Sequence, residues 1–197
     1  MHSDVRDLTA SVNAFRPDGT VADAPALGVE ALDFEAIYSQ YFDFAYRSLR
    51  LLGVEPDALE DRAQDVFGIV AQRLSSFEGK SSVKTWIFGI AQRVAANHRR
   101  VRRRKLDRLE PLEEPLAAPD AGPDAHADAA RTARLIQAFA TSLDEERRAL
   151  FVLGLLERVP PRELAESLGV PLFTMYSRLR SVREACRAFL AEYEVGC

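Results

Sequence analysis

The stretch PPRELAESLGVPLFTMYSRLRSVR, residues 160–183, decides the fold of the C-terminal part of the chain, because it predicts two helices joined by a turn. In the first helix, three apolar residues at helical spacing should share one buried face: Leu164, Ala165 and Leu168. Gly169 suits the turn, since glycine adopts a positive φ at little cost. Pro171 suits the start of the second helix, whose buried stripe should run through Leu172, Met175, Leu179 and Val182.

The other face of the second helix is polar and basic. Its outward residues are Phe173, Thr174, Tyr176, Ser177, Arg178, Arg180 and Ser181. Hydroxyl and guanidinium groups bind base edges and phosphates, and this face has no carboxylate to repel the DNA backbone. The pattern indicates a helix-turn-helix that reads the major groove, with an ordinary helical hairpin as the alternative.

Charge is distributed unevenly along the 197 residues, although the net charge is only −4. Residues 1–30 carry −3 and residues 107–130 carry −6, whereas residues 31–106 carry +4 and residues 131–197 carry +1. The two acidic segments are too poor in large apolar residues to build a core, so we expect an N-terminal extension and a flexible, proline- and alanine-rich linker. The sequence therefore predicts an all-α protein of two small helical domains, 31–106 and 131–197.

The first domain should contain three helices. Asp33 can cap a helix that ends near Gly53, and its apolar positions are Phe34, Ile37, Tyr38, Tyr41, Phe42, Ala45 and Leu49. A second helix, 57–74, turns Leu59, Ala63, Val66, Phe67 and Val70 inward. A third, 83–105, buries Trp86, Ile87, Ile90, Ala91, Val94 and Ala95. The alternative for Trp86 is a role in stacking on a base, but its place in the apolar stripe favours the core.

The third helix ends in six basic residues within seven positions, 99–105. Such a density of like charge repels itself unless an anion is bound. A solvated helix end is the other interpretation, but the helix-turn-helix elsewhere in the chain favours DNA.

Composition excludes several other classes of protein. The longest apolar run, 149–156, is too short to cross a bilayer, and no signal peptide is visible, so we expect a cytoplasmic protein without membrane insertion. The only cysteines, Cys186 and Cys197, form no metal-binding or disulfide pattern. With no nucleophile constellation and no glycine-rich phosphate loop, we expect no enzyme, no metal site and no cofactor.

Two segments resemble one known family. Residues 60–104, EDRAQDVFGIVAQRLSSFEGKSSVKTWIFGIAQRVAANHRRVRRR, are similar to region 2 of the extracytoplasmic-function (ECF) sigma factors of bacterial RNA polymerase. The segment from about Arg131 to Phe189, which contains the helix-turn-helix, resembles their region 4. The two resemblances cover about two thirds of the chain and occur in the family's order.

The resemblance implies roles for region 2. Its second helix would dock on the clamp helices of the polymerase's largest subunit through Asp61, Gln64 and Asp65, which share one helical surface. The loop that follows would capture an unstacked base of the minus 10 element with Phe77, Gly79, Lys80, Ser81, Ser82 and Lys84. The third helix would contact minus 10 DNA, chiefly phosphate, with Asn97 as base reader and with His98, Arg99, Arg100 and Arg103.

For region 4, the resemblance implies recognition of the minus 35 element and docking on the flap of the second-largest subunit. The DNA-binding residues would be Thr174, Tyr176, Ser177, Arg178, Arg180, Ser181 and Arg183. Many relatives have a basic residue where Tyr176 stands and a small or amide residue where Phe173 stands, so the promoter sequence cannot be carried over. Gly68 also replaces a larger apolar residue of the family, inside a helix.

The resemblance implies a sigma factor that binds core RNA polymerase, directs it to promoter DNA and aids strand opening. Sequestration by an anti-sigma factor, which could hold the protein at the membrane, is common in the family. The alternative is a free-standing helix-turn-helix regulator that never joins polymerase, but the first domain resembles no ligand sensor or phospho-receiver.

Overall fold

The computed structural model describes residues 33–106 and 125–195, and within these ranges the secondary structure is helical, without strands. The helices are α2 (Phe34–Leu51), α3 (Leu59–Arg73), α4 (Val83–Leu106), α5 (Ala125–Ser142), α6 (Glu145–Leu150), α7 (Pro161–Leu168) and α8 (Leu172–Val195). The predicted all-α class is confirmed. The predicted extension 1–30 and the linker up to residue 124 lie outside the described residues, and α5 begins inside the segment predicted as linker.

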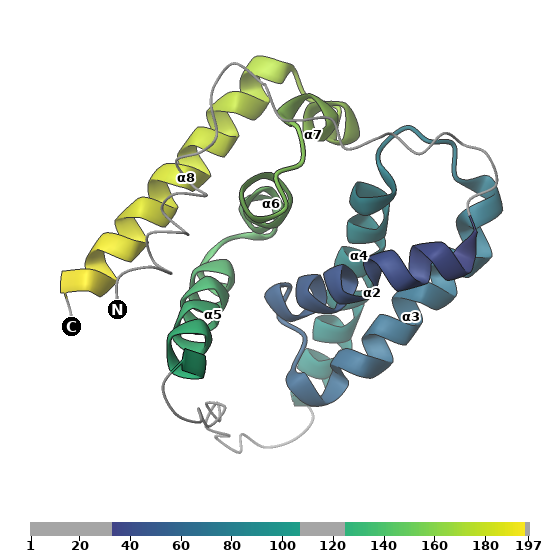
Figure 1. The fold of residues 1–197 in the computed structure, drawn as a ribbon, viewed down its shortest axis with the longest axis horizontal. Coiled ribbons are helices and arrows are strands. Elements are labelled where there is room, and N and C mark those ends of the chain that lie inside the picture. Colours follow the sequence, from purple (N-terminus) through teal and green to yellow (C-terminus); the bar gives the residue numbers. More distant parts are fainter. Residues whose placement is uncertain (1–32, 107–124, 196–197) are drawn as a thin grey trace.

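Helices α2, α3 and α4 pack together as the first helical part (Figure 1). As predicted, Asp33 caps α2, since its carboxylate accepts hydrogen bonds from the backbone N–H groups of Glu35 and Ala36 at 3.4 and 3.3 Å. Short 3-10 turns, Pro56–Ala58 and Leu74–Ser76, flank α3. The apolar residues predicted to be inward on α3 are all buried, as are those on α4 except Trp86, which is partly buried.

The buried stripe of α2 differs from the prediction. Phe34 and Tyr38 are 36% and 40% exposed, whereas Phe44, outside the predicted stripe, is buried with its ring 6.5 Å from that of Phe88. The helix carries apolar residues on more than one face, so their spacing alone does not show which face meets the core. The ring of Tyr38 instead packs edge-on against Phe67 at 4.8 Å.

Helices α5 to α8 form the second helical part (Figure 1). The guanidinium of Arg148 donates hydrogen bonds to the carbonyl oxygens of Ala140 and Leu143 at 2.7 and 2.8 Å, which satisfies carbonyls at the end of α5. Helix α6 continues into a π-helical turn, Phe151–Leu156, that is almost wholly buried.

The helix-turn-helix consists of α7 and α8, and Gly169 adopts the predicted positive φ of 63° between them. Leu164 and Ala165 are buried as predicted, and so are the three later residues of the α8 stripe. The predictions for Leu168 and Leu172 are wrong, because these side chains are 47% and 40% exposed. Both side chains lie next to the turn. Helical periodicity shows which face of a helix is apolar, but it does not show how far along the helix a neighbouring element covers that face.

The two helical parts contact each other. Helix α2 packs beside α5, where the Gln137 amide donates a hydrogen bond to the carbonyl oxygen of Arg50 at 2.8 Å. The Gln92 amide of α4 donates to the Glu145 carboxylate at 3.2 Å. None of the helices in the described ranges combines the length and apolar character needed to cross a membrane.

Candidate nucleic-acid and polymerase interfaces

The polar face of α3 carries the three predicted polymerase-binding residues, and all three are exposed: Asp61, Gln64 and Asp65. The carboxylate of Asp65 forms an ion pair with the guanidinium of Arg62, with 2.9 Å between nitrogen and oxygen, which fixes the carboxylate on the helix surface. Beside this face lies a hollow of about 390 Å³ between α3 and α4, lined by Gln64, Asp65, Gly68, Val94 and Asn97 among others. Gly68 contributes to the hollow, since a Cβ added there would meet no atom within 4 Å.

The loop between α3 and α4 brings an aromatic wall next to small and charged residues. The Phe77 ring packs on that of Trp86 with the centroids 4.8 Å apart, and Trp86 itself packs partly against the core. Gly79 has a positive φ of 68°, which favours glycine in the turn. Lys80 pairs with Glu78, and this hydrogen bond raises the pKa of the Lys80 ammonium and lowers the pKa of the Glu78 carboxyl.

The end of the same loop is bound by the second helical part. One oxygen of the Glu163 carboxylate, on α7, accepts hydrogen bonds from the Ser82 N–H at 3.1 Å, the Ser82 hydroxyl at 2.5 Å and the Thr85 hydroxyl at 2.6 Å. The Lys84 ammonium pairs with Glu157 at 2.8 Å and lies 5.4 Å from the centroid of the Phe44 ring. Ser82 and Lys84, which were predicted to bind DNA, thus bind carboxylates of the second helical part.

The basic end of α4 divides into two groups. The His98 ring nitrogen Nε2 lies 2.7 Å from a Glu55 carboxylate oxygen, and Arg99 donates to the carbonyl oxygen of Leu52, so both side chains face the α2–α3 connection. By contrast, the remaining predicted residues, together with their basic neighbours, are exposed on α4: Asn97, Arg100, Arg103, Arg104 and Lys105. The Asn97 side-chain oxygen accepts a hydrogen bond from Arg100 at 2.9 Å, which orients the amide.

On α8, the predicted DNA-binding residues spread over a broad surface. Ser177, Arg180 and Ser181 are exposed, whereas Thr174, Tyr176, Arg178 and Arg183 are partly buried. Arg178 pairs with Glu146 of α6, and Arg178 and Ser181 line a hollow of about 320 Å³ with acidic residues of that region.

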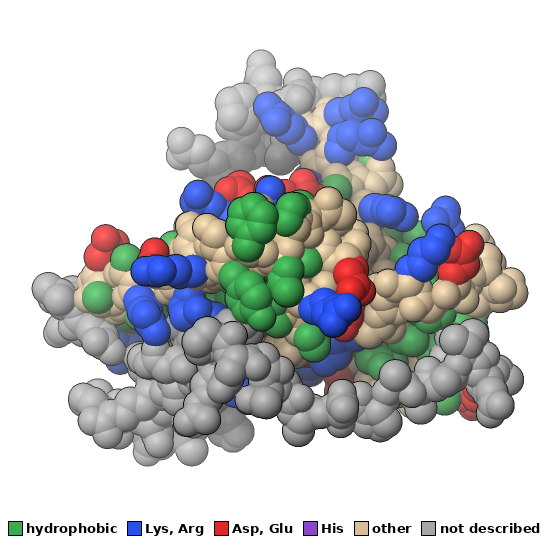
Figure 2. All heavy atoms as spheres, turned by 90° about the horizontal axis from the view of Figure 1, so that it is seen from above, with side chains coloured by type: hydrophobic (Ala, Val, Ile, Leu, Met, Phe, Trp, Pro, Cys, Tyr) green, Lys and Arg blue, Asp and Glu red, His purple; other side chains and the backbone are tan. Residues whose placement is uncertain are grey.

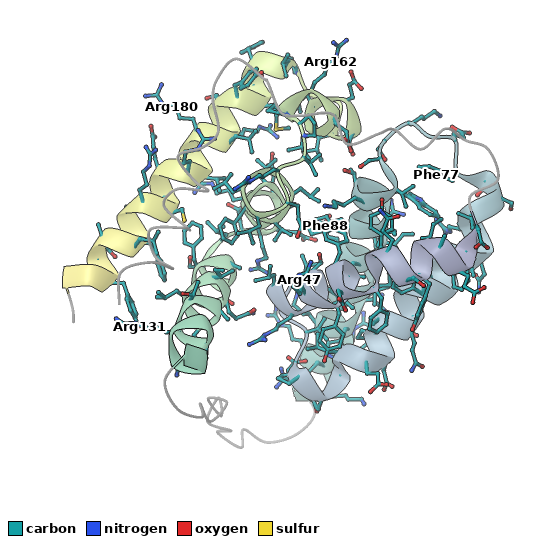
Figure 3. All side chains as sticks on the ribbon, viewed as in Figure 1. Arg47, Phe77, Phe88, Arg131, Arg162 and Arg180 are labelled. Atoms are coloured by element: carbon teal, nitrogen blue, oxygen red, sulfur yellow. The ribbon has the colours of Figure 1, made fainter. Side chains whose placement is uncertain are left out.

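Arg180 projects away from the molecule (Figure 3) and pairs with Glu184 at 2.9 Å, and this hydrogen bond raises the pKa of the Arg180 guanidinium. Burial lowers the pKa of the Arg183 guanidinium.

Glu157 and Glu163, which join the second helical part to the loop, were not predicted from the sequence. Glu163 lies 81 positions from Ser82 along the chain. No local pattern relates residues so far apart, and an isolated glutamate in an amphipathic helix normally indicates a solvated face.

Comparison with known proteins decides the family. The family model of sigma-70 region 2 matches residues 37–105. The ECF RNA polymerase sigma factor SigE of Mycolicibacterium smegmatis is 31% identical over 182 residues, which cover 90% of this chain and 69% of that protein. The chain belongs to the ECF sigma factors. It therefore directs RNA polymerase to promoters and is not an enzyme.

Other relatives of this sigma factor agree with the assignment. The ECF RNA polymerase sigma factor RpoE of Cereibacter sphaeroides is 36% identical over 136 residues, 67% of this chain and 72% of that protein. The fold resembles that of the sigma factor RpoE of Bartonella quintana in complex with the anti-sigma factor NepR, with a TM-score of 0.59 and 20% identity over 81% of this chain and 97% of that one. CnrH in complex with the cytosolic domain of CnrY gives a TM-score of 0.56 and 18% identity over 96% of this chain and 99% of that one.

Proposed function

We propose that this sigma factor binds core polymerase through the polar face of α3 and recognises a two-part promoter through two separate surfaces. The observation that carries the proposal is the exposed grouping of Asp61, Gln64 and Asp65 beside a hollow, with basic surfaces on other elements. Two carboxylates and an amide on adjacent turns suit a basic or polar helical surface, such as the clamp helices of the largest subunit. The second helical part would dock on the flap of the second-largest subunit.

The minus 10 element is assigned to the α3–α4 loop and the end of α4. The paired rings of Phe77 and Trp86 offer an apolar wall, and Gly79 and Ser81 are small residues of the same loop that suit an unstacked base. Ser82 would join them only after leaving Glu163. The exposed arginines Arg100 and Arg103 suit phosphate. His98 and Arg99 would reach DNA only after leaving their contacts with Glu55 and Leu52.

The minus 35 element is assigned to α8. Ser177, Arg180 and Ser181 project from its exposed side, while Arg178 and Arg183 flank them. Arginine forks and hydroxyls of this kind contact phosphates and base edges. The protein would act in the cytoplasm, with an anti-sigma factor as a further partner, as in the complex of the Bartonella quintana sigma factor RpoE with NepR.

A triple alanine variant tests the polymerase-binding assignment. Replacing Asp61, Gln64 and Asp65 together should weaken binding to core polymerase, measured by titration of the labelled protein, and leave the thermal unfolding midpoint unchanged because all three are exposed. The matched control removes two acids and one glutamine from the exposed side of α2: Glu35, Gln40 and Asp43. Wild-type affinity in the α3 variant, or an equal loss in both variants, would overturn the assignment.

A further inference from the structure

Phe173 is the most exposed large hydrophobic residue among the described parts of the chain, with 76% of its surface accessible. Its neighbours Leu168 and Leu172 are also exposed. Seen from the α7–α8 end, hydrophobic side chains gather near the middle of the surface, with both basic and acidic side chains around them (Figure 2). An apolar patch of this kind on a soluble protein marks a binding surface.

The position of Phe173 on α8 relates this patch to DNA. It is the second residue of the helix, and Ser177 and Arg180 lie four and seven positions further, so the three share one exposed stripe. The first acidic residue on α8 is Glu184, which leaves the positive end of the helix dipole without a carboxylate in the first turn. The N-terminal residues of a recognition helix are those that approach base edges in the major groove.

We propose that Phe173 contacts the C5-methyl group of a thymine in the minus 35 element and thereby sets the sequence preference at one position. The inference rests on the proposed role of α8 in minus 35 recognition. A phenyl ring has no hydrogen-bond donor or acceptor, so it cannot read the polar pattern of a base edge. Among the unmodified bases, thymine alone presents a methyl group in the major groove.

A protein partner that docks on the whole apolar patch is the competing occupant. Such a partner would also cover Leu168, which is 47% exposed at the end of α7. Two observations favour DNA. The exposed stripe that contains Phe173 also carries the Ser177 hydroxyl and the Arg180 guanidinium. Arg162 and Arg180 both project outward at this end of the molecule (Figure 3), and each is held only by an exposed ion pair with a glutamate of its own helix, which phosphate could replace.

Substitution of deoxyuridine for thymine tests the contact, because it removes the methyl group and leaves every hydrogen-bonding atom in place. The full chain is assembled with core polymerase, and a promoter is selected by in vitro transcription. Each thymine of the minus 35 element, on both strands, is then replaced in turn. We expect binding about fourfold weaker at one position, the effect of about 0.8 kcal/mol for one buried methyl-sized group.

Variants of the protein connect this loss to Phe173. Phe173→Ala should bind the thymine promoter more weakly and show no difference between thymine and deoxyuridine at that position. Phe173→Leu should retain part of the difference. The matched control Leu168→Ala should keep all of it. Thermal unfolding of each variant checks the fold, which should be unaffected because both side chains are exposed.

Each other outcome overturns the inference. A wild-type holoenzyme that tolerates deoxyuridine at every position, or a Phe173→Ala variant that still discriminates, would remove the thymine contact and leave minus 35 recognition by α8 intact. Equal losses of polymerase affinity in Phe173→Ala and Leu168→Ala, without a deoxyuridine effect, would assign the patch to a protein partner. If the wild-type protein supports transcription from no promoter, the proposed function fails as well.

Discussion

Replacing Glu163 with alanine should loosen the contact between the two helical parts of this sigma factor. The Glu163 carboxylate is the common acceptor for the Ser82 N–H, the Ser82 hydroxyl and the Thr85 hydroxyl, at 3.1, 2.5 and 2.6 Å. It also lies at the start of α4, where backbone N–H groups lack partners within the helix and a negative charge is favourable. The other hydrogen bonds described between the two parts, from Lys84, Gln92 and Gln137, each have an acceptor of their own.

The size of the effect follows from the number and kind of these hydrogen bonds. A hydrogen bond to a charged acceptor contributes about 1.5–3 kcal/mol. The three donors share one oxygen in a partly exposed site, so their contributions do not add, and we take this range for the whole group. Loss of Glu163 should then lower the ratio of contacting to separated forms by roughly ten- to a hundredfold.

Two measurements on the full chain check this expectation. Amide hydrogen exchange in the peptide around Ser82 should accelerate in Glu163→Ala, because its N–H loses its acceptor. Small-angle X-ray scattering should show a larger radius of gyration. Glu166→Ala is the matched control, since Glu166 lies on the same helix and pairs only locally, with Arg162 at 3.2 Å. Unchanged exchange and scattering in Glu163→Ala would refute the reasoning.

The contact bears on promoter binding. A hydroxyl that donates to Glu163 cannot donate the same hydrogen to DNA, and the Lys84 ammonium is already paired with Glu157 at 2.8 Å. A contact in which DNA takes the Ser82 hydroxyl hydrogen therefore requires Glu163 to withdraw first, and a Lys84 ammonium that turns fully toward DNA must give up its ion pair with Glu157. Promoter binding of this kind would carry the free-energy cost of breaking these contacts, and Glu163→Ala would reduce it.

Two helical glycines and one thiol give further expectations. Gly154→Ala should lower the free energy of unfolding by about 1 kcal/mol in urea titrations, because its Cβ would lie 2.4 Å from a methyl carbon of the buried Leu179. Gly68→Ala, with open space around it, should raise the free energy of unfolding by a similar amount. Changes of the same sign in the two variants would contradict the packing argument. Burial raises the pKa of the Cys186 thiol to about 11, so in a Cys197→Ser background it should resist thiol reagents at pH 8 until the protein unfolds. The free energy of unfolding should decline as the pH rises from about 8.5, the pKa of an unfolded cysteine, towards 11. Rapid labelling of the folded protein would contradict the expected protection of the thiol.

Local sequence features predicted much of the fold. The Asp33 cap, the positive φ of Gly169 and the buried stripe through Met175, Leu179 and Val182 each depend on residues within two turns of helix, and each is confirmed. The prediction failed where burial depends on the partner element. Phe44 is buried by Phe88, a residue of another helix.

The predicted site residues show a different limit. Ser82 was predicted as a small polar residue that receives an unstacked base, and Lys84 as a cation for the displaced strand, and in the structure both bind anionic groups. The anions are carboxylates of Glu163 and Glu157, not phosphates. Residue type determines the class of ligand that a side chain can bind, but the ligand bound also depends on what the rest of the chain brings within reach. In this sigma factor the carboxylates of Glu163 and Glu157 bind the donors that we propose for promoter DNA, so DNA that takes the Ser82 hydroxyl hydrogen must displace Glu163.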